Sequence, residues 1–397
     1  MTTPIWDRLV GQDLVVAELT RAVADAELIR RGESGPGMTH AWLVTGPPGS
    51  GRSTAATSFA AALVCAEDGC GACEPCRTVP LGGHPDADIV STDTLSYRTE
   101  DARELVVRSS MSPIRNPWHI IVMEDADRLT EQAVNVLLKA LEEPPPHTVW
   151  VLCAPSVEDV LPTIVSRTRH VSLRTPSPRD VAALLVQKDG ADPAMAAFAA
   201  RASQGHIGRA RALARDEHAR LRRQEVLRTP FQLADVASCF AAAANLLAAA
   251  TEDARAITDV MDEAESANLR TEYGDGASGV TQARLNRMMS SATKEMEKRQ
   301  KTRRTRTVRD QVDRALVDLL GLYRDVLVVQ MDGSVELINE EMRPQISQFA
   351  ARSGQNDTGR RLEAIAYTRE QIGANVTPLL ALESLMVELK DPWIRVA

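Results

Sequence analysis

A glycine-rich stretch near the start of the chain has the residue types and spacing that bind a phosphate group. Residues 46–54 read GPPGSGRST, which matches the pattern G-x-x-x-x-G-K-[ST] except that arginine takes the lysine position. In such a loop, backbone N–H groups and the N-terminus of the following helix surround the phosphates of a nucleotide. A plain Gly-Pro turn between a strand and a helix is the alternative. The full spacing favours a phosphate loop built by Gly46, Gly49, Gly51, Arg52 and Ser53.

The arginine in this loop bears on whether the site hydrolyses ATP. Lysine is a compact charge that reaches the β- and γ-phosphates, whereas arginine is a bulky planar fork. Arg52 keeps the charge but is expected to misplace it. We therefore expect the loop to hold ATP or ADP without hydrolysis. An ATPase that tolerates the substitution is the alternative.

An acidic pair follows the apolar run HIIVM at 119–123. Many nucleotide hydrolases end the corresponding strand with Asp, which helps to hold Mg²⁺, and then Glu, which orients the attacking water. Here the order is inverted, to Glu124 and Asp125. Mg²⁺ demands near-octahedral geometry, and displacing a reacting group by about 1 Å costs roughly a hundredfold in rate. The inversion argues against hydrolysis, and a solvated acidic turn is the less favoured interpretation.

Four cysteines crowd into twelve residues with the spacing C-x4-C-x2-C-x2-C. Tetrahedral Zn²⁺ takes four thiolates, and a site closed by four protein ligands leaves no position open for catalysis. Free thiols or redox chemistry are the less favoured alternatives. The pattern predicts a structural Zn²⁺ site made by Cys65, Cys70, Cys73 and Cys76.

Short apolar runs alternate with helical stretches in the first part of the chain, which predicts a parallel sheet in an α/β domain. We expect this nucleotide-hydrolase-like domain to span residues 1–175, with the zinc site inserted at 65–76. The strands are expected at 40–46, 87–92, 119–124, 149–155 and 169–173.

The rest of the chain is expected to be helical. Ser177 and Pro178 form a favourable helix start, and Ala-rich sequence continues from there. Residues 176–215 are predicted to form a small helical domain. Residues 216–397 are predicted to form an all-helical domain, with helical spacing of apolar residues over 312–331 and 378–390.

Composition limits the classes of protein to consider. The formal net charge of −8 excludes a chain that binds polyanions over its whole surface. The sequence has neither an apolar stretch long enough to span a membrane nor an N-terminal signal pattern, so we expect a cytoplasmic protein without membrane contact.

Together these motifs resemble the clamp-loader family of AAA+ proteins. The most specific match is NVLLKALEEPPPHTVWVL at 135–152, and the cysteine cluster after the phosphate-loop helix is a hallmark of the family. RLVGQ at 8–12 is similar to a family motif near the adenine, which implies a nucleotide contact for Val10. GHPDADIV at 83–90 is similar to the segment before the next strand.

The resemblance also implies a role for LPTIVSRT at 161–168, which is similar to the family's Ser-Arg-Cys motif. There the arginine reaches the ATP γ-phosphate held by a neighbouring subunit, as an arginine finger does. The corresponding residue is Arg167, and an ordinary surface arginine is the alternative. The second sensor of the family is expected near Arg209, with a register ambiguous by one residue.

Three departures from the family's ATPases concern one active site. They are Arg52, the pair Glu124 and Asp125, and Ala154-Pro155 where a polar sensor is usual. The resemblance therefore implies a subunit that does not hydrolyse ATP. It also implies a small helical lid, a collar that joins gamma/tau and delta subunits in a heteropentamer, and contact with a sliding clamp and primer-template DNA through that complex.

Two rival functions follow from other features of the sequence. One is an active AAA+ ATPase, such as the motor subunit of the loader or a replication-repair motor. The other is a zinc-dependent nucleic-acid-binding module, which the net charge disfavours. The run KRQKTRRTRTVR at 298–309 holds seven basic residues and no acid. It is either a solvated segment or a contact for DNA or a partner.

Overall fold

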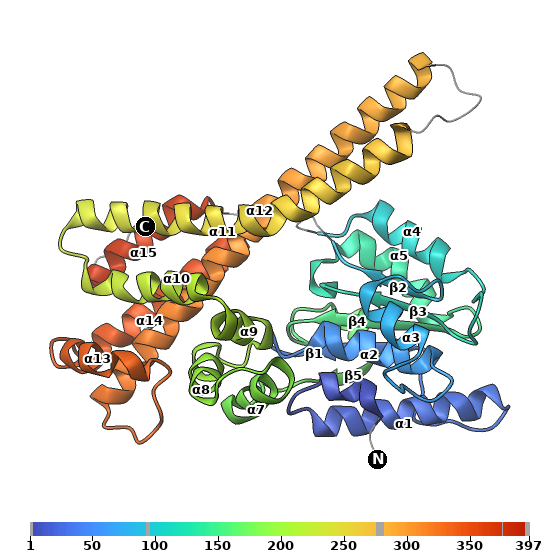
Figure 1. Ribbon diagram of the computed structural model, residues 1–397, viewed down its shortest axis with the longest axis horizontal. Helices are drawn as coiled ribbons and strands as arrows, with labels where there is room; N and C mark the ends of the chain where they lie inside the picture. Colours follow the sequence, from blue (N-terminus) through green and yellow to red (C-terminus); the bar gives the residue numbers. More distant parts are fainter. Residues whose placement is uncertain (1–2, 93–95, 275–281, 375, 394–397) are drawn as a thin grey trace. The chain divides into compact units, whose positions relative to one another are not determined.

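The computed structural model describes residues 3–92, 96–274, 282–374 and 376–393. It divides into two units, Met1–Arg215 and Asp216–Ala397, which are described separately. Figure 1 traces both units by colour along the chain. No helix in the described ranges is long and apolar enough to cross a membrane.

Five parallel strands form the centre of the first unit, in the order β2-β3-β4-β1-β5. The predicted parallel α/β sheet is therefore confirmed, and each strand lies inside the run predicted for it except that β4 begins one residue earlier. In register, Leu43 of β1 pairs with Leu152 of β4 and with His170 of β5. The strands are β1 (Ala41–Thr45), β2 (Ala87–Val90), β3 (His119–Met123), β4 (Thr148–Ala154) and β5 (Arg169–Ser172).

Helices cover both faces of the sheet and thereby create two apolar layers. Ile120 and Val122 of β3 contribute to the layer with α1 and α2, whereas Ile121 and Met123 contribute to the layer with α4 and α5. Such two-sided burial explains why the strands are continuous apolar runs rather than alternating ones. In this unit the helices are α1 (Asp13–Arg30), α2 (Arg52–Val64), α3 (Glu74–Thr78), α4 (Thr99–Ser109), α5 (Glu131–Glu142), α6 (Pro162–Val165), α7 (Pro178–Asp189), α8 (Pro193–Ala202) and α9 (Ile207–Arg215).

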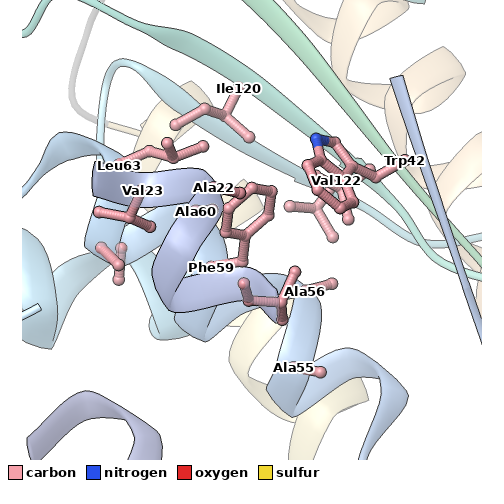
Figure 2. Close-up of a cluster of buried hydrophobic side chains, with 14 of the residues drawn as sticks. Ala22, Val23, Trp42, Ala55, Ala56, Phe59, Ala60, Leu63, Ile120 and Val122 are labelled. Carbon is pink, nitrogen blue, oxygen red and sulfur yellow. The ribbon is translucent and has the colours of Figure 1, made fainter. Parts of the chain in front are cut away.

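The helix after the phosphate loop, α2, is buried from Ala55 to Val64. Its alanines allow close approach on all sides, and Phe59 supplies the bulk that fills the layer. Figure 2 shows Phe59 beside Trp42 of β1, and their ring centroids lie 5.1 Å apart in an edge-to-face arrangement. This packing fixes the start of α2, and with it the loop, against the edge of the sheet.

The predicted helix start at Ser177 is also present. The Ser177 hydroxyl accepts a hydrogen bond from the backbone N–H of Asp180, and Pro178 occupies the first turn of α7. Helices α7, α8 and α9 pack against one another at the end of the first unit.

In the described residues, the second unit contains helices and no strand. Val312, Leu316, Leu319 and Tyr323 of α12 lie in its apolar core, as the helical spacing predicted. The helices are α10 (Glu217–Arg228), α11 (Val236–Gly274), α12 (Gln282–Gln330), α13 (Arg343–Ala350), α14 (Gln355–Gly373) and α15 (Pro378–Lys390).

Candidate functional site

The glycine-rich loop connects the end of β1 to the start of α2, as its motif predicted. Gly49 and Gly51 have φ angles of 81° and 98°, a conformation that other residues adopt only with strain. Gly51 caps α2, and its carbonyl accepts the N–H of Ala55 at 2.7 Å. The loop therefore has the backbone of an anion-binding turn at a helix N-terminus.

The guanidinium in the lysine position is engaged within the loop itself. Nη1 of Arg52 donates a hydrogen bond of 2.8 Å to the carbonyl oxygen of Gly46. Arginine's length and fork allow the side chain to fold back in this way. In this arrangement, the positive charge that would face the nucleotide phosphates is directed to the protein backbone.

The start of α9 also contacts the loop. A Cβ atom placed on Gly49 would lie 2.3 Å from Cγ of His206, so the histidine packs directly against this glycine. The N–H of Ile207 also donates to the carbonyl oxygen of Gly49 at 3.4 Å. His206 was not among the predicted site residues, and its neighbour Arg209 was. The backbone N–H of Arg209 donates to Nδ1 of His206 at 3.2 Å.

The acidic pair lies where β3 ends, at the edge of the sheet that the loop also occupies. The Glu124 N–H donates to Val90 and its carbonyl accepts from the Tyr97 hydroxyl at 2.7 Å. Asp125 then adopts a left-handed conformation with φ 54°, which turns the chain into a short 3-10 helix.

A third carboxylate follows this pair and was not predicted as a site residue. Burial raises the pKa of the Asp127 carboxyl, and the charge of Asp125 adds to the effect. Arg52 acts on the same carboxyl in the opposite direction, so it lies within electrostatic reach of this acidic strand end.

The predicted sensor position carries no polar side chain. Ala154 is buried at the end of β4, and the Pro155 carbonyl accepts the N–H of Gly46 at 3.1 Å. Burial raises the pKa of the neighbouring Cys153 thiol to about 12, and the charge of Glu124 contributes. The C-terminal ends of the adjacent strands β3, β4 and β1 thus bring the three departures to one edge of the sheet.

The N-terminal motif is joined to the strand edge through Gln12. Its side-chain amide donates to the Arg174 carbonyl at 2.7 Å, and Nε of Arg174 donates to the Gly11 carbonyl at 2.7 Å. These bonds hold Val10 and the following residues beside the segment that links β5 to α7. These two hydrogen bonds fix the position of the motif, but they do not test whether Val10 contacts a nucleotide.

Arg167 lies between α6 and β5, and its partners come from α5 and α6. Its Nε and Nη2 lie 2.6 and 2.5 Å from Oε1 of Glu142, while Nη1 donates to the carbonyl of Thr163 at 2.8 Å. The Arg167 side chain is 35% exposed, so solvent and a partner can reach the guanidinium. Among the described residues, none of its bonds is to the phosphate loop. Glu142 belongs to the conspicuous EEPPP sequence, but only the structure pairs it with Arg167.

The four clustered cysteines come together as their spacing predicted. Their sulfur atoms all lie within 4.8 Å of one another, and Sγ of Cys65 is 3.8 Å from that of Cys70 and 3.6 Å from that of Cys73. A tetrahedral ion with Zn–S bonds of about 2.3 Å would place its sulfurs roughly 3.8 Å apart. The cluster therefore fits a metal ion of this kind.

The backbone around the cysteines supports thiolate ligands. The N–H groups of Glu67 and Cys70 point at Sγ of Cys65, each at 3.4 Å. Hydrogen bonds from the N–H groups of Ala72 and Cys73 lower the pKa of the Cys70 thiol to about 7, whereas burial raises that of Cys76. A bound cation would favour the thiolate form of all four.

The strand order β2-β3-β4-β1-β5, with the phosphate loop after β1 and the acidic pair after β3, defines an AAA+ nucleotide-binding fold. A family model described as DNA polymerase III, delta subunit, matches residues 26–177. This match and the relatives below show that the chain is similar to clamp-loader subunits of DNA polymerase III, in line with the resemblance of its motifs.

Two kinds of relative are similar to this chain. Over 184 residues it is 35% identical to the DNA polymerase III subunit gamma/tau of Mycobacterium tuberculosis, covering 45% of this chain and 30% of that protein. It is 23% identical to the delta' subunit of Bacillus subtilis over 357 residues, and the match covers 89% of this chain and 92% of that protein. The delta' subunit of Pseudomonas aeruginosa is 34% identical over 134 residues, and the match covers 32% of this chain and 41% of that protein. The chain thus spans less than a third of the gamma/tau relative.

Proposed function

We propose that this chain is a clamp-loader subunit of the delta-prime type, which does not hydrolyse ATP and supplies Arg167 to the ATP site of a neighbouring subunit. The nearly end-to-end similarity to the Bacillus subtilis delta' subunit supports this type over gamma/tau, whose similarity stops at 45% of the chain. The proposed partners are gamma/tau and delta subunits, and through them the sliding clamp and primer-template DNA. Such a complex acts in the cytoplasm.

The observation that carries the proposal is the state of the phosphate loop. Arg52 bonds to the Gly46 carbonyl, and His206 packs on Gly49. Hydrolysis needs a cation on the γ-phosphate, a metal-holding carboxylate and a positioned water, each in near-ideal geometry. Before Arg52 could contact the phosphates of bound ATP or ADP, its hydrogen bond to the Gly46 carbonyl would have to break. Even then, the inverted pair Glu124 and Asp125 would misplace Mg²⁺ and the attacking water.

Arg167 is the candidate catalytic group because its guanidinium is both held in place and accessible. Glu142 and the Thr163 carbonyl fix its orientation, while a third of the side chain faces solvent. An arginine supplied in trans stabilises the charge that develops on the transferred phosphoryl group. Glu142 is the positioning residue of this pair.

The cysteine cluster has a separate, structural role in this proposal. Zn²⁺ held by Cys65, Cys70, Cys73 and Cys76 would stabilise the segment between α2 and β2 and take no part in ATP chemistry. The carbonyl of Gly69 in this segment accepts the N–H of Ile5, so the ion would also fix the N-terminal segment.

The decisive experiment reconstitutes the loader with Arg167→Ala, Arg167→Lys and Arg179→Ala variants of this chain. Arg179 is also exposed but lies outside the motif, so its variant controls for loss of a surface charge. ATP turnover at the neighbouring site should fall by about 10³ to 10⁵ in Arg167→Ala. Arg167→Lys should also be impaired because lysine lacks the fork. All variants should assemble, and normal turnover in an assembled Arg167→Ala complex would refute the role.

The 35% identity to gamma/tau over 184 residues supports a second candidate, an active ATPase. The purified chain distinguishes the two. ATP turnover by the isolated chain, lost on changing Glu124 or Asp125 to alanine, would establish the ATPase and contradict our proposal.

A further inference from the structure

Helices α11 and α12 form a long antiparallel hairpin whose outer part lies beyond the apolar core of the second unit. Figure 1 shows the two helices side by side, extending past the other helices of that unit. Core residues end at Ala250 on α11 and begin at Val308 on α12. We call residues 252–274 and 282–307 the distal hairpin. The basic run of the sequence lies almost entirely in it, on α12.

Ion pairs join the two helices of the distal hairpin, and they occupy part of this basic run. Arg303 binds Asp262 and Glu265, each at 2.8 Å, and Arg304 binds Asp259 at 2.9 Å. The run therefore has an inner part, whose charge is neutralised by α11, and an outer part.

The outer part of the run, from Lys298 to Lys301, continues into a mainly basic face that includes Lys294, which precedes the run, and the exposed acid Glu297. Lys294, Lys298 and Lys301 are spaced by four and three residues, which places them on one side of α12, and Arg299 lies next to them. All four side chains are exposed.

The chemistry of this face favours a phosphate backbone over a protein. The centre of a protein interface is depleted in charge and enriched in aromatic residues and methionine, and the four exposed cations offer neither. Ile257, Val260 and Met261 are exposed on α11 instead, on a helix rich in acids. The run 298–309 has no aromatic residue, so it has no side chain on which the bases of a single strand could stack.

We propose that this basic face, Lys294, Lys298, Arg299 and Lys301, binds the sugar-phosphate backbone of duplex DNA. The seven steps from Lys294 to Lys301 rise about 10 Å, which matches roughly three phosphate-to-phosphate steps at about 3.4 Å of duplex axis per step along one strand. Such contacts carry no sequence specificity and depend steeply on salt. Which DNA this face meets in the cell rests on the proposed function, whereas the binding itself can be measured with this chain alone.

The test measures binding of a fluorescent 20-base-pair duplex to the full chain by anisotropy at 50 and 200 mM salt. The variant is Lys294→Gln/Lys298→Gln/Lys301→Gln. The matched control is Arg228→Gln/Arg352→Gln/Lys390→Gln, which removes three exposed charges elsewhere in the second unit, two on helices α10 and α15 and one in the turn after α13. If each lysine neutralises one phosphate, the salt slope drops by about 0.9 per lysine, so salt should weaken the variant about 40-fold less than wild type.

The control should bind as wild type does, and circular dichroism should show equal helix content in all three proteins. Equal affinity and salt slope in the lysine variant and the control would overturn the proposal, as would absence of duplex binding by the wild type at 50 mM salt. Stronger competition by an acidic polypeptide than by unlabelled duplex would assign the face to a protein and overturn it as well. The lysine variant should retain Arg167-dependent ATP turnover in a reconstituted loader at saturating DNA, so the two proposals fail separately.

Discussion

At the scale of single residues, the GHPDADIV segment contains a buried carboxylate that organises a neighbouring loop. Asp86 is 1% exposed and accepts the backbone N–H groups of Ile114, Arg115 and Asn116 at 2.5, 2.9 and 2.9 Å. Burial opposes its ionisation, but these donors outweigh burial and hold the pKa of Asp86 below its ordinary value. The carboxylate thus anchors the loop that leads into β3.

We predict that Asp86→Asn lowers the free energy of unfolding of the first unit by about 1–3 kcal/mol at pH 7, since buried donors lose their acceptor. Because the folded pKa is lowered, the wild-type contribution is present above the unfolded pKa of about 3.9 and is lost as pH falls through the folded value. The difference between wild type and variant should therefore shrink in acid. Denaturant titrations between pH 3 and 7 measure it, with the exposed Asp7→Asn as control. A difference that grows as pH falls would contradict the assignment.

The candidate site shows which residue-level features a sequence can predict. Glycine spacing predicts the phosphate loop because positive φ angles and close approach restrict those positions to glycine. The contacts of Arg52 with Gly46 and of Arg167 with Glu142 depend on which rotamer a flexible side chain adopts. The contact of His206 with Gly49 joins segments more than 150 residues apart. None of the three leaves a local pattern in the sequence.

At the scale of helices and strands, the sheet was predicted closely and the distal hairpin was not. Each strand is a short apolar run buried on both faces, so its ends coincide with the loss of apolar residues. In the distal hairpin, the buried positions mix apolar Ala254 and Met296 with polar Thr258 and Asp262, and ion pairs contribute to the pairing of the two helices. The sequence therefore predicted helix in general for this unit, without the hairpin.

The ion pairs of the distal hairpin lead to a prediction for Arg303. Its guanidinium holds the pKa of Glu265 below the ordinary value and contacts Asp262, whose side chain is 12% exposed. Arg303→Ala leaves both carboxylates without this partner, which should lower the free energy of local opening by about 1–3 kcal/mol. Amide hydrogen exchange in residues 254–266 should accelerate by roughly 5- to 150-fold.

The exposed Lys298→Ala on the same helix is the control for that variant. It should leave exchange in 254–266 unchanged, and neither variant should alter exchange of the core segment 312–323 of α12. Wild-type exchange rates in Arg303→Ala would show that apolar contacts, not the ion pairs, hold the hairpin closed.

At the scale of the whole molecule, each unit has an apolar core of its own. A perturbation of one core is then expected to leave the other folded. The proposed zinc site belongs to the first unit, whose core includes Cys65 and Cys76. Four of the five tryptophans, Trp6, Trp42, Trp118 and Trp150, also lie in that unit, so tryptophan fluorescence reports mainly on it.

We predict about one zinc per chain, measured by elemental analysis, and loss of that zinc in Cys70→Ser/Cys73→Ser. The fluorescence-detected melting temperature should fall in this variant, because metal binding is coupled to folding of the segment that carries the ligands. The melting of the helical second unit, followed by circular dichroism, should not change. Cys153→Ser, outside the cluster, should keep its zinc. Full zinc content in the double variant would rule out these ligands.

The pairing of Arg167 with Glu142 has a consequence for selectivity. A guanidinium bonded to a carboxylate is electrically neutral when viewed from more than a few ångströms away, so this surface exerts little attraction on free phosphate or nucleotide in solution. Only an anion delivered at contact distance, with enough charge to compete with Glu142, can engage the arginine. The carboxylate would thus restrict the arginine to phosphates presented by a docked neighbour and keep it from being occupied by stray anions between encounters.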